Sequence, residues 1–260
     1  MAELIVRREG AVGWLLISNL QKHNAVTYEM LQALPEAVAK HDRDGNVRVI
    51  ALAGDGSEAF ASGADIKQYA AIRGSQYAAS SYGQMLDTVY QSFASLRKPT
   101  VAKIRGACIG IGLSLAVCCD LRMVTKSAHI SHPASRFGMG ISWGGMRRLI
   151  SLIGPGDAAD LVFSARSITG RRAYKIGFAS RVVADADLDR EFASLCEAIA
   201  AGAPLTIAAA KRAITEALRD PAERNLKELQ AMIDGCNASD DYKEGLASYG
   251  AKRPPQFKGR

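Results

Sequence analysis

The stretch Lys98-Pro-Thr-Val-Ala-Lys-Ile-Arg-Gly-Ala-Cys-Ile-Gly-Ile-Gly-Leu-Ser-Leu115 decides the fold. Proline opens a short apolar run at 100–104, which is typical of a buried β-strand. Spaced glycines follow, and the apolar segment 113–119 predicts a buried helix. Free N–H groups at the start of such a helix, together with the positive end of its dipole, suit an oxygen that becomes negative during a reaction.

A second strand and glycine-bearing loop precede this stretch. Residues 47–53 (VRVIALA) predict another buried strand, and the loop after it leads into Ala59-Phe-Ala-Ser-Gly-Ala-Asp-Ile-Lys67. Small residues let main-chain N–H groups approach a ligand oxygen, although a tight turn explains this motif alone equally well. Ligands commonly bind beyond the carboxyl ends of strands in open α/β sheets. We therefore expect the chemistry at these two loops.

The rest of the chain predicts an α/β fold. Apolar runs at 4–6 and 14–18 predict a hairpin turned near Gly10, and Thr27 is placed to cap a helix whose apolar residues include Met30 and Leu34. Further elements are an amphipathic helix over 75–96 and a strand over 121–125. Beyond about residue 185 the pattern is purely helical. We expect a core with the site over 1–185 and a helical region over 186–260.

Composition favours an ordinary globular protein. The chain is 48% hydrophobic and 23% charged, enough apolar material for one sizeable domain. No apolar run is long enough for a membrane span, and the first residues lack a signal pattern, so we expect a cytoplasmic protein. The cysteines are odd in number and form no CxxC pair, which argues against a zinc site or a disulfide framework and for buried, reduced thiols: Cys108, Cys118, Cys119, Cys196 and Cys236.

The net charge of +7 is compatible with an anionic partner. The basic residues are scattered as pairs such as Arg147-Arg148 and Arg171-Arg172, without interleaved aromatic residues. A surface that follows nucleic-acid phosphates usually needs a stripe of cations, so this distribution argues against nucleic-acid binding. A phosphorylated small molecule fits it equally well.

Taken in order, the motifs resemble those of the crotonase superfamily, the enoyl-CoA hydratase/isomerase family. The resemblance covers almost the whole chain and is carried by Asn19-Leu-Gln-Lys-His-Asn-Ala-Val26, the two glycine-bearing loops, Ala165-Arg-Ser-Ile-Thr-Gly-Arg-Arg-Ala-Tyr-Lys-Ile-Gly-Phe-Ala-Ser-Arg-Val-Val183, and the tail from Glu244 to Arg260. It implies a spiral of ββα units with a helical C-terminal region used in trimer formation, and trimers that often pair into hexamers. It also implies an acyl-CoA thioester as substrate, with coenzyme A as part of that substrate and no tightly bound cofactor or metal.

The resemblance also assigns site residues. It places the two backbone amides of an oxyanion hole at Ala64 and Ile111, where many family members have glycine at the second position. Ile111 keeps its N–H, provided that its side chain points away from the thioester. Residues matching the coenzyme A region are Lys22, His23, Ala25, Ile66, Lys67 and Gly110. Lys22 and Lys67 either offer cations to the phosphates or are solvated surface lysines.

The chain departs from the family at its acid–base positions. The two hydratase glutamates fall on Ser114 and Ala134, and the aspartates of other branches fall on Ile141 and Ser142. A seryl hydroxyl is not a useful general base at neutral pH without activation. Hydration by two glutamates is therefore not expected.

Other polar residues lie near these positions in the sequence: Ser114, His132, Ser135, Ser142 and Trp143. His132 is the best candidate base among them, because an ordinary histidine titrates near pH 6.5. It stands where the family usually has glutamine, so a hydrogen-bonding or packing role competes, and His129 is a weaker candidate. Cys108 beside the second loop is expected to be a small buried side chain.

Three functions remain open from the sequence. The first is hydratase/isomerase-type enolate chemistry without the usual glutamates. The second is decarboxylation of a malonyl-type thioester, or related carbon–carbon cleavage, which forms the enolate by losing CO2 and needs no base. Missing carboxylates favour it, because they reduce repulsion against a substrate carboxylate. The third is a noncatalytic acyl-CoA-binding protein.

Overall fold

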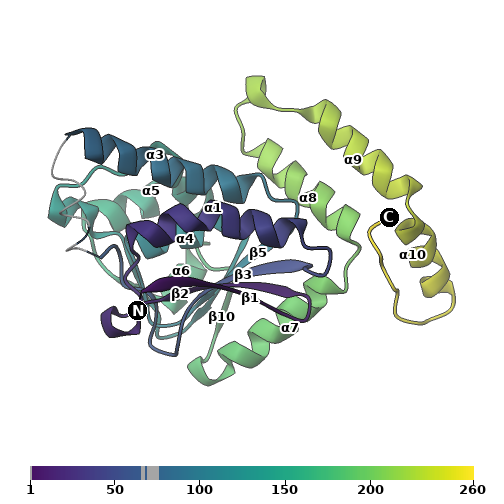
Figure 1. Cartoon of the computed structure of the whole chain (residues 1–260), viewed down its shortest axis with the longest axis horizontal. Coiled ribbons are helices and arrows are strands. Elements are labelled where there is room, and N and C mark those ends of the chain that lie inside the picture. Colours follow the sequence, from purple (N-terminus) through teal and green to yellow (C-terminus); the bar gives the residue numbers. More distant parts are fainter. Residues whose placement is uncertain (1, 66–67, 69–75) are drawn as a thin grey trace.

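A computed structural model of the chain describes residues 2–65, 68 and 76–260, and its described strands form two sheets (Figure 1). One sheet has the strand order β1-β2-β3-β5-β7-β10, and the other has β4-β6-β8-β9. The strands are β1 (Glu3–Glu9), β2 (Val12–Ser18), β3 (Val49–Gly54), β4 (Ala59–Ala61), β5 (Thr100–Ile104), β6 (Ala107–Ile109), β7 (Leu121–Thr125), β8 (His129–Ser131), β9 (Ile168–Thr169) and β10 (Arg181–Val183).

Helices cover the larger sheet on both faces and continue beyond it to the C-terminus (Figure 1). They are α1 (Tyr28–Arg43), α3 (Gln76–Ala94), α4 (Ile111–Cys118), α5 (Trp143–Phe163), α6 (Gly170–Lys175), α7 (Leu188–Ala200), α8 (Pro204–Ala217), α9 (Leu226–Ala238) and α10 (Asp240–Gly250).

Successive strand pairs follow one repeating path. β3, β5 and β7 lie parallel in the larger sheet, while β4, β6 and β8, each the next strand in the chain, lie parallel in the smaller one. α3, α4 and α5 follow these pairs in turn. The predicted α/β fold is confirmed, and its ββα units wind as the resemblance implied. Because equivalent strands are parallel, the loops after β4 and β6 leave the smaller sheet at the same edge.

The hairpin and the first helix form as predicted. β1 and β2 pair antiparallel, and Gly10 in the turn has φ +56°. The Thr27 side chain accepts a hydrogen bond from the Met30 N–H, and Met30 and Leu34 are buried. The predicted start of the strand at 47 was wrong: β3 begins at Val49, because the Val47 N–H donates into a turn, to the carbonyl of Asp44.

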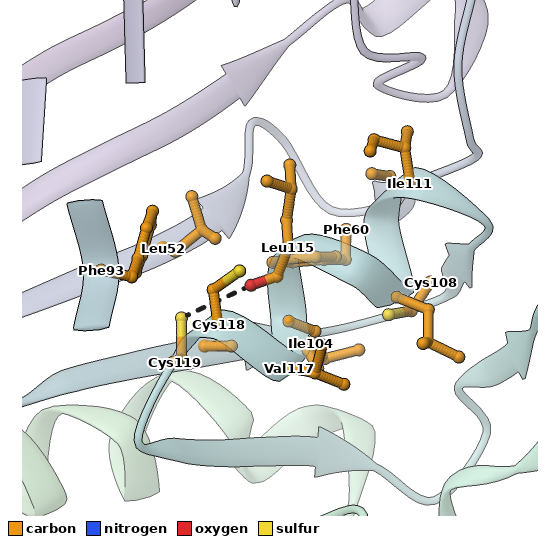
Figure 2. Close-up of a cluster of buried hydrophobic side chains, with 14 of the residues drawn as sticks. Leu52, Phe60, Phe93, Ile104, Cys108, Ile111, Leu115, Val117, Cys118 and Cys119 are labelled. Atoms are coloured by element: carbon orange, nitrogen blue, oxygen red, sulfur yellow. Dashed lines mark hydrogen bonds between the residues drawn. The ribbon is translucent and has the colours of Figure 1, made fainter. Parts of the chain in front are cut away.

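The central core surrounds α4. Figure 2 shows Ile111 at one end of this helix and Cys118 and Cys119 at the other, beside Leu52 of β3 and Phe93 of α3. The Cys118 thiol donates to the carbonyl of Ser114 one turn earlier, and burial raises the pKa of this thiol to about 12. The predicted helix 113–119 is confirmed as α4, which begins two residues earlier, at Ile111.

Four of the five cysteines are buried as predicted, and Cys236 is the exception. It lies on α9, on which no described residue is buried, so the prediction of a buried thiol was wrong there. α9 and α10 extend away from the sheets (Figure 1), because the core is already covered by α1, α3 and α5 on one face and α7 on the other.

The C-terminal helices carry large apolar side chains that this chain leaves exposed. They include Leu226, Ile233, Tyr242, Leu246 and Tyr249. No single described helix is long and apolar enough to cross a membrane; one pair bent by 103°, Asp185–Ala200 with Pro204–Ala217, passes that test by length and composition only.

Candidate functional site

Two backbone hydrogen bonds join the loop after β4 to the segment before α1 and leave the Ala64 N–H unused by either segment. The Val26 N–H donates to the Gly63 carbonyl (2.8 Å), and the Asp65 N–H donates to the Val26 carbonyl (2.9 Å). In this alternating pattern the Ala64 N–H has no acceptor among the described residues. Gly63 has φ +120°, a conformation that only glycine adopts readily. The pairing of these two segments therefore leaves the Ala64 N–H as a donor.

Further bonds tie the predicted coenzyme A segment to this loop. The Ser62 N–H donates to the His23 carbonyl (3.1 Å), and the Ser62 hydroxyl donates to the Lys22 carbonyl (2.8 Å). The Asn24 side-chain amide donates to the Ala59 carbonyl (2.8 Å). The segment that resembles a coenzyme A region is thus hydrogen-bonded to the loop that holds Ala64.

The loop after β6 presents the second amide. Gly110 has φ +54°, and its N–H donates to the Ser131 carbonyl at the end of β8 (2.9 Å). Ile111 is the first residue of α4, so its N–H has no intrahelical partner and points out of the helix N-terminus. No described residue accepts from it. The helix dipole adds positive potential there.

Two glycines bring these loops together. A methyl group built on Gly112 would lie 2.7 Å from the Ala61 carbonyl oxygen, so only glycine allows the first turn of α4 to press against β4. A methyl group on Gly63 would lie 3.6 Å from the Ile109 carbonyl oxygen, which is ordinary contact between the two loops. Ala64 and Ile111 therefore offer, from adjoining loops, two N–H groups that no described residue accepts, an arrangement suited to one developing oxyanion.

The positions at which the resemblance placed missing carboxylates lie in this region. Ser114 is in α4, one turn after Ile111, and is buried. Ala134 is buried in the 3-10 turn Pro133–Phe137, and Ile141 packs against the central core. Ser142 caps α5, where its hydroxyl accepts from the Gly145 N–H (3.2 Å).

Other residues singled out from the sequence are not gathered here. The Ser135 hydroxyl donates to the Phe163 carbonyl at the end of α5 (3.3 Å), and the Trp143 residue is 76% exposed. His129 is exposed on β8. Cys108 is fully buried, and burial raises the pKa of its thiol far above the ordinary value, which makes it inert as a nucleophile.

His132 directly follows Ser131, whose carbonyl holds the Gly110 N–H. Its Nδ1 atom is buried and has no hydrogen-bond partner among the described residues. Burial lowers the pKa of the imidazole, so the ring is neutral at neutral pH. A buried nitrogen without a partner is costly, which makes it a place for a ligand hydrogen bond.

Tyr90 of α3 is a residue that the sequence reasoning missed. It is buried, and its hydroxyl lies beside the side chains of Ser114 and Ser142. Burial raises the pKa of the phenol, which the two neighbouring serine hydroxyls partly oppose. Its sequence signal was a tyrosine on the apolar face of an amphipathic helix, since a buried phenol usually needs a polar partner.

The predicted coenzyme A residues already have partners within the chain. Lys22 Nζ lies 2.5 Å from Asp65 Oδ2, and His23 Nδ1 lies 3.1 Å from Glu58 Oε2. The Lys22 ammonium is half-exposed, although the Asp65 side chain beside it is only 11% exposed, so a phosphate can reach and compete for this cation. The His23–Glu58 pair is exposed and contributes at most about 1 kcal/mol. Ala25 is buried. Ile66 and Lys67 lie outside the described residues. Within the described ranges no group of three or more His, Cys, Asp or Glu side chains is arranged to hold a metal ion.

Known proteins share this fold along nearly the entire chain. The family model for enoyl-CoA hydratase/isomerase matches residues 7–260. A crotonyl-CoA hydratase from Syntrophomonas wolfei is 28% identical, over 98% of this chain and 97% of its own. An enoyl-CoA hydratase/carnithine racemase structure from Magnetospirillum magneticum is 31% identical with a TM-score of 0.92, covering 100% of this chain and 97% of that one. An enoyl-CoA hydratase structure from Bacillus anthracis is 27% identical with a TM-score of 0.91, covering 99% of each chain.

Proposed function

The chain belongs to the enoyl-CoA hydratase/isomerase family, and on that basis we propose that it binds an acyl-CoA thioester and stabilises its enolate between the Ala64 and Ile111 amides. The observation that carries this proposal is the pair of backbone N–H groups, on adjoining loops, that find no acceptor within residues 2–65, 68 and 76–260. Both groups are set by local backbone geometry before any ligand arrives. They therefore cost little reorganisation when the thioester oxygen becomes negative.

The expected chemistry follows from where charge develops. Forming an enolate moves negative charge onto the thioester oxygen, and each donor aimed at that oxygen contributes about 2.7–4 kcal/mol in a comparable acyl-transfer site. The α4 N-terminus adds its dipole at Ile111. The acyl chain of the substrate takes no part in stabilising this charge, so the same pair of amides serves several reactions of one class of thioester.

We assign hydratase/isomerase-type enolate chemistry without the two-glutamate arrangement. Serine and alanine occupy the two positions that align with those glutamates, Ser114 and Ala134. His132 is neutral, and no described residue pairs with its Nδ1, so it is the base that this proposal assigns for removing a substrate proton.

A second candidate is decarboxylation of a malonyl-type thioester. Arg148 of α5 supports it: its guanidinium donates to the carbonyls of Val117 and Cys118, and its charge acts on the Tyr90 hydroxyl. No described carboxylate forms an ion pair with Arg148. A positive charge near the acyl chain favours an anionic acyl group.

Replacing Ile111 with proline tests the proposed oxyanion hole. Ile111 is the first residue of α4, where proline is well tolerated, so Ile111→Pro removes the N–H and keeps the helix. We expect turnover of the accepted acyl-CoA to fall about 10²–10³-fold, while Ile111→Ala, which keeps the N–H, stays within about threefold of the wild type. The assay follows crotonyl-CoA hydration and malonyl-CoA and methylmalonyl-CoA decarboxylation by product analysis.

The outcomes separate the candidates. Hydration of crotonyl-CoA at ordinary enzyme rates excludes the decarboxylase. Calorimetry that shows acyl-CoA binding with no product from any of the three substrates supports a noncatalytic binding protein. Equal turnover in Ile111→Pro and the wild type removes Ile111 from the site. Failure to bind any acyl-CoA refutes the whole proposal.

We also propose that the exposed apolar side chains of the C-terminal helices are covered by other copies of the chain, in a homotrimer or a hexamer of two trimers. Leu246 and Tyr249 lie on α10 with 61% and 88% of their surface exposed. Light scattering behind a sizing column is expected to give a trimeric or hexameric mass for the wild type and a smaller one for the double variant Leu246→Glu, Tyr249→Glu. A monomeric wild type contradicts this proposal.

A further inference from the structure

Three helices bring three hydroxyl groups together beside the proposed oxyanion hole. Tyr90 comes from the C-terminal half of α3, Ser114 from α4, and Ser142 from the cap of α5. Tyr90 and Ser114 are only 6% and 8% exposed. No motif joins these residues in the sequence, and no carboxylate position of the family resemblance includes Tyr90. We call them the hydroxyl cluster.

Two glycines at the start of α5 make room for the phenol. A methyl group on Gly145 would lie 2.6 Å from the Tyr90 hydroxyl oxygen and 3.1 Å from Ser142 Oγ, and one on Gly144 would lie 3.3 Å from the Tyr90 ring. Any larger residue at Gly145 would displace the hydroxyl. The position of the phenol is therefore built into the backbone of the neighbouring helix.

The hydroxyl cluster lies on the face of α4 that reaches solvent. Ile111 and Ser114 are three residues apart, so they are neighbours on one helix face. Each is 8% exposed, whereas the residues from Leu115 to Cys118 are at most 3% exposed. A thioester whose oxygen meets the Ile111 N–H therefore has the hydroxyl cluster beside its next carbons.

We propose that the Tyr90 hydroxyl, held by Ser114 and Ser142, donates the proton that quenches the thioester enolate at its α-carbon. The inference rests on the proposed function. A C–H bond forms with the electron pair of the enolate as the phenolic O–H bond breaks, and the thioester carbonyl is restored. The resulting phenolate takes a proton from water, which returns Tyr90 to its starting state.

The chemistry of the site suits this role. Burial raises the pKa of Tyr90, so the phenol is protonated at neutral pH. It is nevertheless far more acidic than the α-carbon of a thioester, so proton transfer to the enolate is downhill. The neighbouring hydroxyls of Ser114 and Ser142 and the charge of Arg148 lower the pKa of the phenol and so stabilise the phenolate while it lasts. The phenol thus serves as the proton donor in a site where serine and alanine replace the aligned carboxylates.

Asp87 is the rival proton donor. It lies one turn before Tyr90 in α3, and its Oδ1 would lie 3.5 Å from a methyl group on Gly144. It is exposed, unlike Tyr90. The comparison of Asp87→Asn with Tyr90→Phe therefore decides between them.

The test uses the full chain with Tyr90→Phe, Asp87→Asn and the matched control Tyr174→Phe. Tyr174 is a half-exposed tyrosine of α6, outside the site. Crotonyl-CoA and malonyl-CoA are supplied in deuterated water, and turnover, deuterium at the product α-carbon and acyl-CoA affinity are measured. We expect Tyr90→Phe to bind within about threefold of the wild type while its turnover falls about 10²-fold or more. Asp87→Asn and Tyr174→Phe are expected to remain within about threefold.

The outcomes distinguish this inference from the function on which it rests. Wild-type turnover in Tyr90→Phe overturns the inference, as does a loss confined to Asp87→Asn, while the effect of Ile111→Pro still tests the oxyanion hole. A wild type that binds acyl-CoA without turnover also overturns it and leaves binding intact. If Tyr90→Phe fails to fold, Ser114→Ala supplies the test: an affinity unchanged with turnover lowered about tenfold supports the inference, and unchanged turnover overturns it.

Discussion

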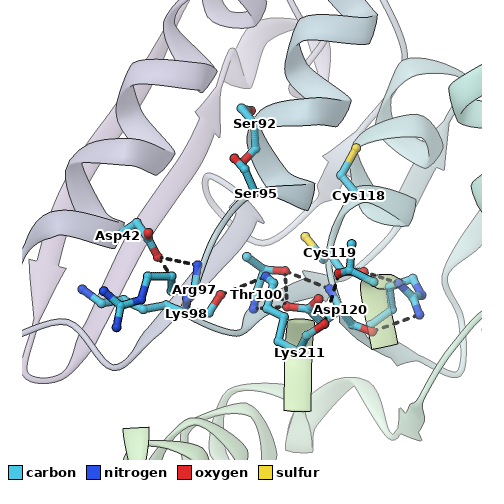
Figure 3. Close-up of polar contacts among 12 residues, drawn as sticks. Asp42, Ser92, Ser95, Arg97, Lys98, Thr100, Cys118, Cys119, Asp120 and Lys211 are labelled. Carbon is cyan, nitrogen blue, oxygen red and sulfur yellow. Dashed lines mark hydrogen bonds and ion pairs between the residues drawn. The ribbon is translucent and has the colours of Figure 1, made fainter. Parts of the chain in front are cut away.

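At the amino ends of β5 and β7 polar groups bond to one another, whereas beyond the carboxyl ends of β4, β6 and β8 a few polar groups have no partner among the described residues. Figure 3 shows the first region, in which Lys211 of α8 meets Asp120 just before β7. Lys211 Nζ donates to Asp120 Oδ2 (2.7 Å) and to the Lys98 carbonyl (2.9 Å), and the Thr100 hydroxyl donates to the same Asp120 oxygen (2.8 Å).

Further bonds complete this amino-end network. Lys98 Nζ donates to the carbonyls of His41 and Asp44 at the end of α1, and Asp42 Oδ1 accepts from the N–H groups of Arg97 and Lys98. These polar groups join α1, α8 and the sheet.

In the site region, by contrast, three polar groups have no hydrogen-bond partner among the described residues. The Ala64 and Ile111 N–H groups and His132 Nδ1 have no acceptor or donor among the described residues. An unpaired buried polar group costs about 1–3 kcal/mol, which a ligand that pairs with it recovers. The difference between the two regions indicates where a substrate binds: paired polar groups stabilise the fold, whereas polar groups without a partner are available to a substrate.

Breaking the amino-end network gives the largest effect on stability. Asp120→Asn leaves the buried Lys211 ammonium without its carboxylate, so we expect the free energy of unfolding to fall by about 3 kcal/mol. The control Asp189→Asn removes an exposed partner of Lys103 and Arg105 and is expected to cost less than about 1 kcal/mol. Urea unfolding measures both. Equal losses in the two variants contradict the contrast between the regions.

Two helix caps sharpen the comparison. Ser142 caps α5 inside the hydroxyl cluster, and Ser239 caps α10 far from it. Ser142→Ala and Ser239→Ala are each expected to lower the free energy of unfolding by about 1 kcal/mol, because each removes a cap hydrogen bond. Turnover of acyl-CoA should fall only in Ser142→Ala. A similar loss of turnover in both variants shows that Ser142 acts through stability alone.

A third and smallest effect is the pH dependence of stability. Burial lowers the pKa of His41 in the amino-end region and of His132 at the site, from the ordinary value of 6.5. The unfolded chain therefore binds these protons more readily, so the free energy of unfolding is highest above pH 6.5 and falls as the pH drops toward the folded pKa values.

Urea unfolding at several pH values checks this effect. We expect His132→Asn to flatten the fall in stability between pH 7.5 and 5.5 relative to the wild type. A saturating acyl-CoA should preserve stability at low pH in the wild type only if it pairs with neutral His132. An unchanged pH profile in His132→Asn contradicts the assignment of the shift to this residue.

Much of the local structure was accessible without coordinates. The hairpin, the Thr27 cap, the strands near 100–104 and 121–125 and the buried helix α4 follow from hydrophobic period and turn chemistry, which act over a few residues. Element ends were less certain. β3 begins after Val47 and α4 before Leu113, because the competing turn and helix-start hydrogen bonds depend on more distant backbone.

The sequence by itself determined the fold class and the order of the two glycine-bearing loops, since glycine is needed wherever the backbone turns sharply or packs closely. It also specified that serine and alanine occupy the positions aligned with the hydratase glutamates. Tertiary structure alone decided that Tyr90 meets Ser114 and Ser142, because helices α3, α4 and α5 converge across long sequence separations. It also decided that the amides of Ala64 and Ile111 have no partner in the part of the chain that the structure describes, since a hydrogen bond left unmade has no sequence pattern of its own.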